Sequence, residues 1–234
     1  MFFKKGELNS LKLAHYQKNI EMKKFITVCT LSLSCALFAA ATIPTVESEE
    51  GSGPNSGRTS YTVKNMEASI IWTGRKITGA SHTGSMELKE NSLEFMGKNL
   101  VGGSFVVDMN SIKVRDLSGS SAEKLTRHLK SDDFFGVSNY PESNFTISDV
   151  KAGSEKGKYE VTGDLKIKST TLPISFPVQM TWEGNQAIAT AEIKVNRADY
   201  DVRYGSGRFF AGLGDRAIND EFRLEVRIVS YVGE

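Results

Sequence analysis

The stretch Lys158–Lys168 reads KYEVTGDLKIK and alternates apolar and polar side chains at nearly every second position. Successive side chains of a β-strand point to opposite faces, so the two kinds of side chain would lie on opposite faces of an extended chain. This pattern is typical of a strand with one buried and one solvated face. The buried face would hold Tyr159, Val161, Leu165 and Ile167, and the solvated face Thr162, Asp164, Lys166 and Lys168.

The same alternation continues on both sides of this stretch. Leu172–Trp182 follows it and places every second side chain, from Leu172 through Phe176 to Trp182, on one apolar face. A tight turn is expected between Lys89 and Asn91. The other expected strands are Ser69–Arg75 with a lead-in at Tyr61–Val63, His82–Lys89, Asn91–Phe95, Gly102–Ile112, Asn144–Val150, Gln186–Asn196 and Glu221–Val232.

This register predicts which side chains share an interior. A slip of one residue would move every charge inside, so the prediction is strict. The residues expected to point inward are Trp72, Phe105, Leu165, Phe176, Met180 and Leu224, and those expected to face water are Lys166, Lys168, Glu192, Lys194, Arg223 and Glu225.

One segment departs from the strand pattern. In Ser120–Lys130, Ala122, Leu125 and Leu129 recur at helical spacing, and Ser121 is a candidate N-cap. Basic residues gather towards the negative end of this expected helix. Many amphipathic strands in series with one helix predict an all-β fold, an antiparallel barrel or a sandwich. The periodicity does not distinguish the two, nor a filled lumen from one that holds a ligand.

The N-terminal part has a different composition. Residues 1–41 hold six lysines and two glutamates, a net charge of +4. A short basic stretch begins at Met22, an apolar run follows, and Ala39-x-Ala41 offers a cleavage site, which is the layout of a signal peptide for export to the periplasm or outside the cell. We expect Met22 to be the true start and residues 42–59 to be a flexible tether.

Two alternatives remain open for this N-terminal segment. One is an uncleaved anchor, and the other is a lipoprotein modified at Cys35. Both cysteines, Cys29 and Cys35, lie within the segment, so a processed domain would contain no thiol.

Composition and motifs argue against several function classes. A formal net charge of +1 does not suggest a nucleic-acid-binding protein. His82 and His128 have no closely spaced cysteine or carboxylate set, so no metal site or other cofactor is expected. No G-x-S-x-G elbow, P-loop or H-E-x-x-H motif occurs, so an enzyme is not expected. Arg197 and Asp199 are interpreted as a structural ion pair or turn.

Several motifs carry a family resemblance across residues 60–232. They are His128–Phe135 followed by Tyr140-Pro141, Gly163–Lys168 followed by Pro173 and Phe176-Pro177, and Arg197–Val202. In this order they resemble the YceI-like polyisoprenoid-binding family. The resemblance implies a single antiparallel lipocalin-like β-barrel with one short helix, usually exported and non-enzymatic. Its long apolar lumen would hold a polyisoprenoid or an isoprenoid-quinone-like chain.

The pattern alone favours a dry core for most of the inward residues. The resemblance is what makes the inward apolar faces a candidate ligand channel. Phe134 and Phe135 are either loop anchors or the aromatic lip of a lipid entrance. The Gly-rich segment 205–214 departs from the family pattern and is expected at the barrel mouth. The candidate lumen residues are Trp72, Met86, Phe105, Val107, Phe134, Phe135, Phe145, Val161, Leu165, Phe176, Met180 and Leu224.

The expected function is therefore to sequester or carry a long isoprenoid-type lipid outside the cytoplasm. The alternative is a filled-barrel adaptor or stress-related module without a lipid ligand. Transient contact with a membrane or a membrane protein fits either function, and the sequence predicts no oligomeric state.

Overall fold

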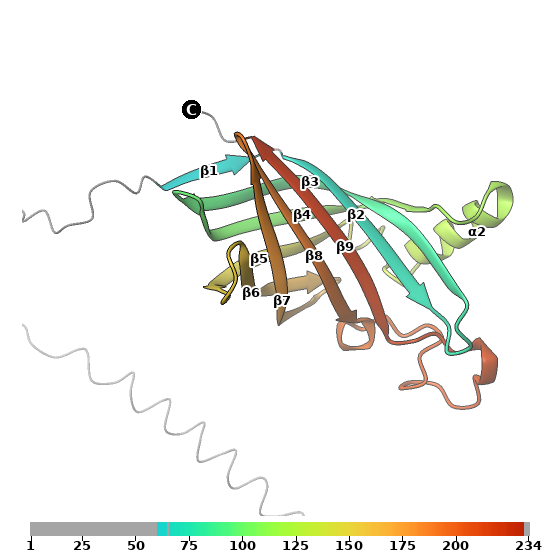
Figure 1. The fold of residues 1–234 in the computed structure, drawn as a ribbon. Coiled ribbons are helices and arrows are strands. Elements are labelled where there is room, and N and C mark those ends of the chain that lie inside the picture. The colour runs from blue at the N-terminus through green and yellow to red at the C-terminus, as the bar shows by residue number, and fades with distance from the viewer. Residues whose placement is uncertain (1–59, 65, 232–234) are drawn as a thin grey trace, which may run out of the picture. The chain divides into compact units, whose positions relative to one another are not determined.

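The computed structural model describes residues 60–64 and 66–231, and the expected signal peptide and tether lie outside them (Figure 1). Nine strands in the described residues form one antiparallel sheet. The elements are β1 (Ser60–Lys64), β2 (Glu67–Arg75), β3 (Ser81–Met96), β4 (Asn99–Val114), α2 (Gly119–Lys130), β5 (Glu142–Ala152), β6 (Lys158–Ile167), β7 (Thr170–Glu183), β8 (Gln186–Asn196), the 3₁₀ turns η1 (Arg197–Tyr200) and η2 (Gly214–Arg216), and β9 (Glu221–Tyr231).

The sheet closes into a barrel because β3 pairs with strands on both of its sides. The order is β1-β3-β2-β9-β8-β7-β6-β5-β4, and β3 also pairs with β4. β2 pairs with the first half of β3 and β1 with its second half, so together they fill one place in an eight-stranded barrel. Asn91 spans the break between them, since its side chain accepts from the Met66 amide at 2.6 Å and donates to the Met66 carbonyl at 3.2 Å. The predicted barrel is confirmed, and the sandwich alternative is wrong.

β3 differs from the prediction. The expected turn between Lys89 and Asn91 is wrong, because one strand runs from Ser81 to Met96. Leu88 pairs with Val107 and Glu90 with Val106, which leaves Lys89 as an extra residue in a β-bulge. A bulge shifts the alternation of the residues that follow it, and in the sequence that shift resembles the end of a strand.

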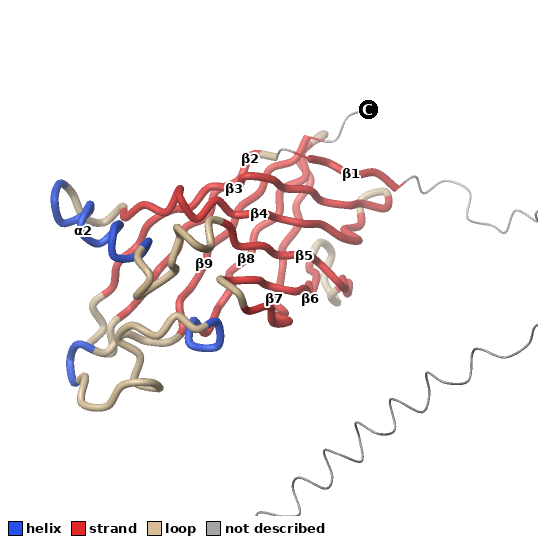
Figure 2. The backbone as a smooth tube through the Cα atoms, turned by 180° about the vertical axis from the view of Figure 1, so that it is seen from behind, coloured by secondary structure: helices blue, strands red, loops and turns tan. Residues whose placement is uncertain are grey.

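The helix α2 lies at one end of the barrel, beyond β4 (Figures 1 and 2). It spans Gly119–Lys130, close to the predicted range, and Leu129 is its buried residue. Three basic residues occupy the last turn, as expected for its negative end. The prediction of a cap at Ser121 is wrong, because the helix begins after Ser118, whose side chain makes no capping hydrogen bond.

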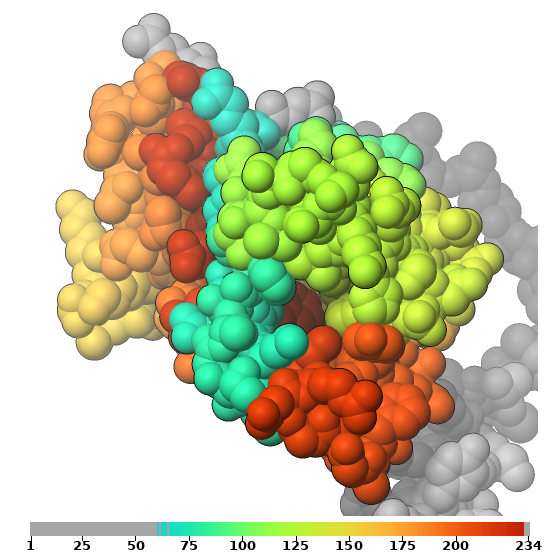
Figure 3. Space-filling model, turned by 90° about the vertical axis from the view of Figure 1, so that its right-hand side faces the viewer, coloured from blue at the N-terminus to red at the C-terminus, as the bar shows by residue number. Residues whose placement is uncertain are grey.

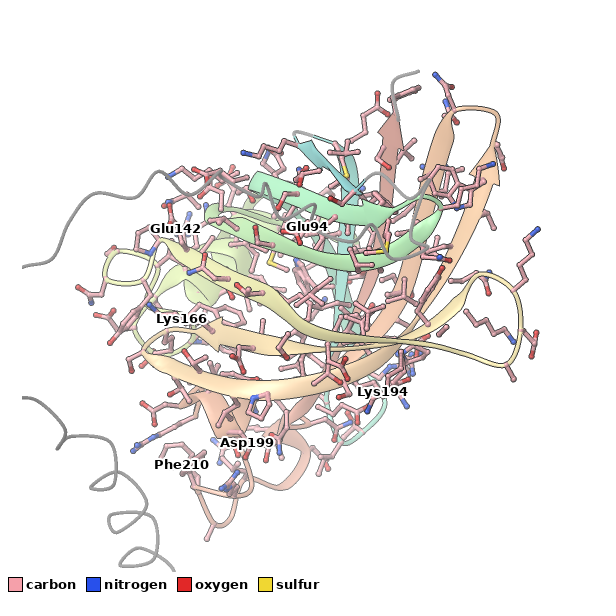
Figure 4. The ribbon with its side chains drawn as sticks, turned by 90° about the vertical axis from the view of Figure 1, so that its left-hand side faces the viewer. Glu94, Glu142, Lys166, Lys194, Asp199 and Phe210 are labelled. Atoms are coloured by element: carbon pink, nitrogen blue, oxygen red, sulfur yellow. The ribbon has the colours of Figure 1, made fainter. Side chains whose placement is uncertain are left out.

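The predicted strand faces agree with the structure at all but one position. Trp72, Leu165, Phe176 and Met180 are buried, and Phe105 and Leu224 are half-buried and pack against the same core. Of the residues expected to face water, Lys166, Glu192, Lys194 and Glu225 are exposed, and Arg223 is partly exposed beside Glu192 (Figure 4).

Lys168 is the exception, because its side chain is only 13% exposed. It lies in the β6–β7 turn with a φ of +54°, outside the strand whose alternation was used to place it.

Candidate functional site

A cavity of about 120 Å³, the inner cavity, occupies the middle of the barrel. Its wall consists of strand side chains and exposes no polar surface. This follows from the period-two pattern, because every strand presents its apolar face to the same interior. The predicted lumen residues that line it are Met86, Phe105, Val107, Phe145, Val161, Leu165, Phe176 and Leu224.

A second cavity, the mouth cavity, also measures about 120 Å³ and lies towards α2. Its wall includes the polar residues Ser143, Arg197 and Asn219. Four residues line both cavities, and we call these shared residues the waist: Met86, Val107, Leu165 and Leu224. The two cavities are therefore adjacent parts of one lumen. The mouth cavity adds Trp72, Phe134 and Phe135 from the predicted set.

Met180 is the one predicted lumen residue that lines neither cavity. It is buried in the cluster that contains Phe95, and Phe95 packs edge-on against Trp182 at 5.7 Å between ring centroids. Both rings belong to the strand ends farthest from α2. Side chains therefore fill this end of the barrel, and the prediction for Met180 is wrong in detail because its strand extends past the cavity.

The opposite end is open. Figure 3 shows a hollow between α2, the β2–β3 hairpin and the segment before β9, with part of β9 visible inside. Phe134 is buried in the wall of the mouth cavity, and its ring lies 5.1 Å from that of His128, 5.3 Å from that of Tyr204 and 6.2 Å from that of Phe135. Phe134 and Phe135 both line the mouth cavity, and Phe134 also contacts the segment before β9. Both rings therefore form part of the mouth wall, and Phe134 also anchors the segment before β9.

Arg197 organises the segment before β9. It is 3% exposed, and its guanidinium donates to the carbonyls of Val202, Tyr204, Ile218 and Asn219 at 2.8–3.1 Å. Burial lowers its pKa, an effect opposed by the charge of Asp220, whose Oδ1 lies 3.3 Å from Nη2. The predicted turn is confirmed as η1, but an ion pair with Asp199 is wrong, since Asp199 pairs with Arg208. Four carbonyl acceptors leave this guanidinium little capacity to bind a ligand.

The Gly-rich segment 205–214 lies at the mouth, as expected. Its base is fixed, since the Ile218 amide donates to the Gly205 carbonyl at 2.8 Å. Phe210, labelled in Figure 4, is 49% exposed and Phe209 is 38% exposed. The Arg203 guanidinium lies over the Phe209 ring at 5.1 Å. Sequence reasoning missed this pair as a candidate surface. The available signal was two adjacent aromatic residues in a Gly-rich stretch with no apolar alternation.

One polar group in the mouth wall lacks a protein partner. Trp72 is buried and its indole Nε1 has no hydrogen-bond acceptor. An unpaired buried donor costs free energy, so an acceptor supplied by a ligand would stabilise this position.

Residues 61–230 match the YceI-like domain family. The chain belongs to this family. A UPF0312 protein of Photorhabdus laumondii is 33% identical over 103 residues, covering 42% of this chain and 52% of that protein. Protein YceI of Escherichia coli O157:H7 is 27% identical over 124 residues, covering 50% and 62% respectively. The matches thus span about half to three-fifths of the length of these relatives.

Two solved structures share the fold. BcnA of Burkholderia cenocepacia has a TM-score of 0.58 at 17% identity, over 70% of this chain and 99% of that one. A polyisoprenoid binding domain from Saccharophagus degradans, implicated in plant cell wall breakdown, has a TM-score of 0.54 at 12% identity, over 74% and 100%. These likenesses identify the lipocalin-like barrel of the YceI fold.

No helix among the described residues is long and apolar enough to cross a membrane. No group of three or more histidine, cysteine, aspartate or glutamate residues within 60–64 and 66–231 is placed to hold a metal ion.

Proposed function

We propose that the barrel binds a long isoprenoid-type lipid in its lumen and sequesters or carries it, without acting on it as an enzyme. The observation that carries this proposal is the inner cavity, whose wall exposes no polar surface and which shares the four waist residues with the mouth cavity. Membership of the YceI-like family and the fold shared with a polyisoprenoid binding domain support the same ligand class.

Burial of the ligand's hydrocarbon chain supplies the binding free energy in this mechanism. Each methylene removed from water contributes about 0.8 kcal/mol, so a long chain binds without many polar contacts. Such binding discriminates poorly between chain lengths, because no group in the inner wall recognises a particular carbon.

The ligand must also enlarge the lumen. Each cavity measures about 120 Å³, whereas pockets for drug-sized ligands measure roughly 300–1,000 Å³. Side chains at the waist and beyond the inner cavity therefore change rotamer when a long chain binds. Met86 suits this role, because an unbranched thioether side chain adapts to irregular space.

The head group would sit at the mouth and would be neutral. Arg197 already donates to four carbonyls and lies beside the Asp220 carboxylate, so it has little capacity left to hold a phosphate. Trp72 Nε1, a buried donor without a protein acceptor in the same wall, matches a single hydroxyl or carbonyl oxygen. An isoprenoid alcohol or a quinone fits this arrangement better than a diphosphate.

The proposed location is outside the cytoplasm, because residues 22–41 have the layout of a signal peptide. N-terminal sequencing of exported protein should find Thr42 or a neighbour as the first residue. A lipid-modified Cys35 at the terminus, or a retained N-terminal segment, would contradict soluble export.

Mass spectrometry of lipid extracts from purified protein, combined with native mass spectrometry, tests the ligand directly. We expect a co-purifying isoprenoid alcohol or quinone that leaves the protein on delipidation and rebinds. A protein that carries no lipid and takes up neither solanesol nor ubiquinone from vesicles would instead be the filled-barrel adaptor.

A further inference from the structure

The barrel wall is incomplete between β7 and β8. Their ladder runs from Glu183↔Gln186 at the connecting turn to Val178↔Ala191, where it stops. Within the described residues, no backbone pairing joins Thr170–Pro177 to Glu192–Asn196. Figure 1 shows the two strands together near their turn and apart at their other ends. We call this separation the fork.

Two prolines keep the fork from closing. Pro173 lies opposite Asp164 of β6, and Pro177 lies opposite Glu160. Proline has no backbone N–H, so neither residue can donate a hydrogen bond to a neighbouring strand. In an antiparallel ladder, a residue that does not hydrogen-bond to one neighbouring strand directs its backbone groups to the other. The missing donors of both prolines therefore face β8, and β8 cannot extend its ladder past them.

The inner cavity and a groove on the outer surface share part of the barrel wall next to the fork. This groove, of about 520 Å³, lies on the outside of the barrel over β2, β9, β8 and β7. Val178, Thr190, Ala191 and Val226 line both this groove and the inner cavity. Three of these four belong to the last two pairs of the β7–β8 ladder. Only one layer of side chains separates the cavity from the groove there.

Apolar side chains fill the fork. Ile174 and Phe176 of β7 and Ile193 of β8 point into the barrel and pack in its core clusters. Side-chain packing therefore takes the place of ladder pairs between these parts of the two strands. The fork can therefore widen without breaking a backbone hydrogen bond, which is not true where the ladder is complete.

A single polar link closes the wide end of the fork. Lys168, in the turn before β7, donates from Nζ to the Asp201 carbonyl at 2.9 Å, and Asp201 follows η1 at the end of β8. The Asp201 carboxylate lies 3.8 Å from the same Nζ. This link explains why Lys168 is sheltered, against the prediction that it faces water.

We infer that the fork is a lateral portal through which the apolar chain of the ligand passes between the inner cavity and the outer groove. This inference rests on the proposed function. A chain that enters sideways through a slot need not be threaded end-first through the waist. The groove, with Ile71 and Pro177 beside Lys158 and Arg227, receives the chain during its passage.

A thiol staple across the outer surface tests the portal. In a Cys29→Ser/Cys35→Ser background, Ser175→Cys with Lys194→Cys places two exposed thiols beyond the last ladder pair and leaves both prolines in place. Gln179→Cys with Thr190→Cys is the matched control, on the same strands but inside the ladder. A short bifunctional thiol reagent joins each pair, and uptake of solanesol from phosphatidylcholine vesicles is followed over time.

The staple across the fork should slow uptake by about tenfold, a barrier increase of about 1.4 kcal/mol, while the control staple leaves the rate close to that of the parent. Lys168→Met, which removes the polar link, should increase the rate without any staple. Equal rates for the two stapled proteins would overturn the portal. If the unstapled parent takes up no solanesol, the proposed function itself fails. That outcome differs from the one in which the parent takes up solanesol and both stapled proteins do so at equal rates, which contradicts only the portal.

Discussion

The inner cavity and the mouth cavity have similar volumes but are built by different means. Strand side chains alone line the inner cavity, and their order follows from the period-two pattern. The mouth cavity depends on α2, on Phe134 and Phe135, and on the segment before β9, which the buried Arg197 holds in place. A regular pattern thus creates the apolar interior, and irregular segments with specific polar contacts decide how it is reached.

Loss of Arg197 should have the largest effect on stability, and it should act on the mouth. Arg197→Met leaves Asp220 without its buried partner and four carbonyls without their donor. Breaking such a buried charge pair costs about 3–5 kcal/mol. Chemical denaturation should measure this decrease in the free energy of unfolding, and hydrogen exchange should place the first loss of protection in residues 197–220.

Arg208→Met is the control for that variant. Arg208 pairs with Asp199 at the same end of the barrel, but both side chains are exposed. Exposed pairs contribute about 0–1 kcal/mol, so this variant should remain close to the parent. Equal losses from the two substitutions would mean that burial of Arg197 does not stabilise the mouth.

A bulky residue in the inner wall should have an intermediate effect. Val161 is 1% exposed and lines the inner cavity, whereas Val107 is half-buried at the waist beside both cavities. Overpacking costs about 1–3 kcal/mol of the free energy of unfolding. The cost of Val161→Trp should lie at the upper end, because Val161 borders only the inner cavity whereas Val107 borders both cavities. Both variants should lose co-purified lipid.

Two measurements on each variant separate the causes: extracted lipid by mass spectrometry, and the thermal midpoint of the delipidated protein. Loss of lipid from Val107→Trp with an unchanged midpoint would support a ligand channel through the waist. A lowered midpoint in both variants, with no lipid in the parent, would mean a dry core and defeat the carrier.

The same contrast explains what the sequence could predict. Alternation alone identified most inward residues, because a strand face is set by neighbours two positions away. It could not identify the acceptors of Arg197, since Ile218 and Asn219 lie more than twenty positions along the chain. Lys168 was misplaced because a turn with positive φ ends the alternation just before it.

The fork was beyond prediction for a similar reason. Prolines at 173 and 177 are visible in the sequence, but which neighbouring strand their missing donors face depends on the pairing partner of each residue. Strand pairing joins residues far apart in the sequence, so the alternation of side chains within one strand does not predict it. Phe209 and Phe210 were not predicted as a candidate surface, because residues in a loop show no alternation of apolar and polar side chains.

The exposed aromatic pair at the mouth should have the smallest effect on stability and a clear effect on lipid transfer. Phe210 is 49% exposed beside the Gly-rich segment, so Phe210→Ser removes little buried surface. A surface change of this kind usually alters the free energy of unfolding by less than about 0.5 kcal/mol. If the mouth rim touches the membrane that supplies the lipid, the ring inserts among the head groups, as amphipathic aromatic surfaces do at such interfaces.

Uptake of solanesol from vesicles should therefore slow in Phe210→Ser while the thermal midpoint stays constant. Tyr231→Ser is the matched control, because Tyr231 is 53% exposed and ends β9 at the opposite end of the barrel (Figure 1). It should change neither quantity. Equal slowing in both variants would indicate a general effect of exposed aromatic rings, and no slowing in Phe210→Ser would mean that the mouth rim does not contact the membrane during transfer.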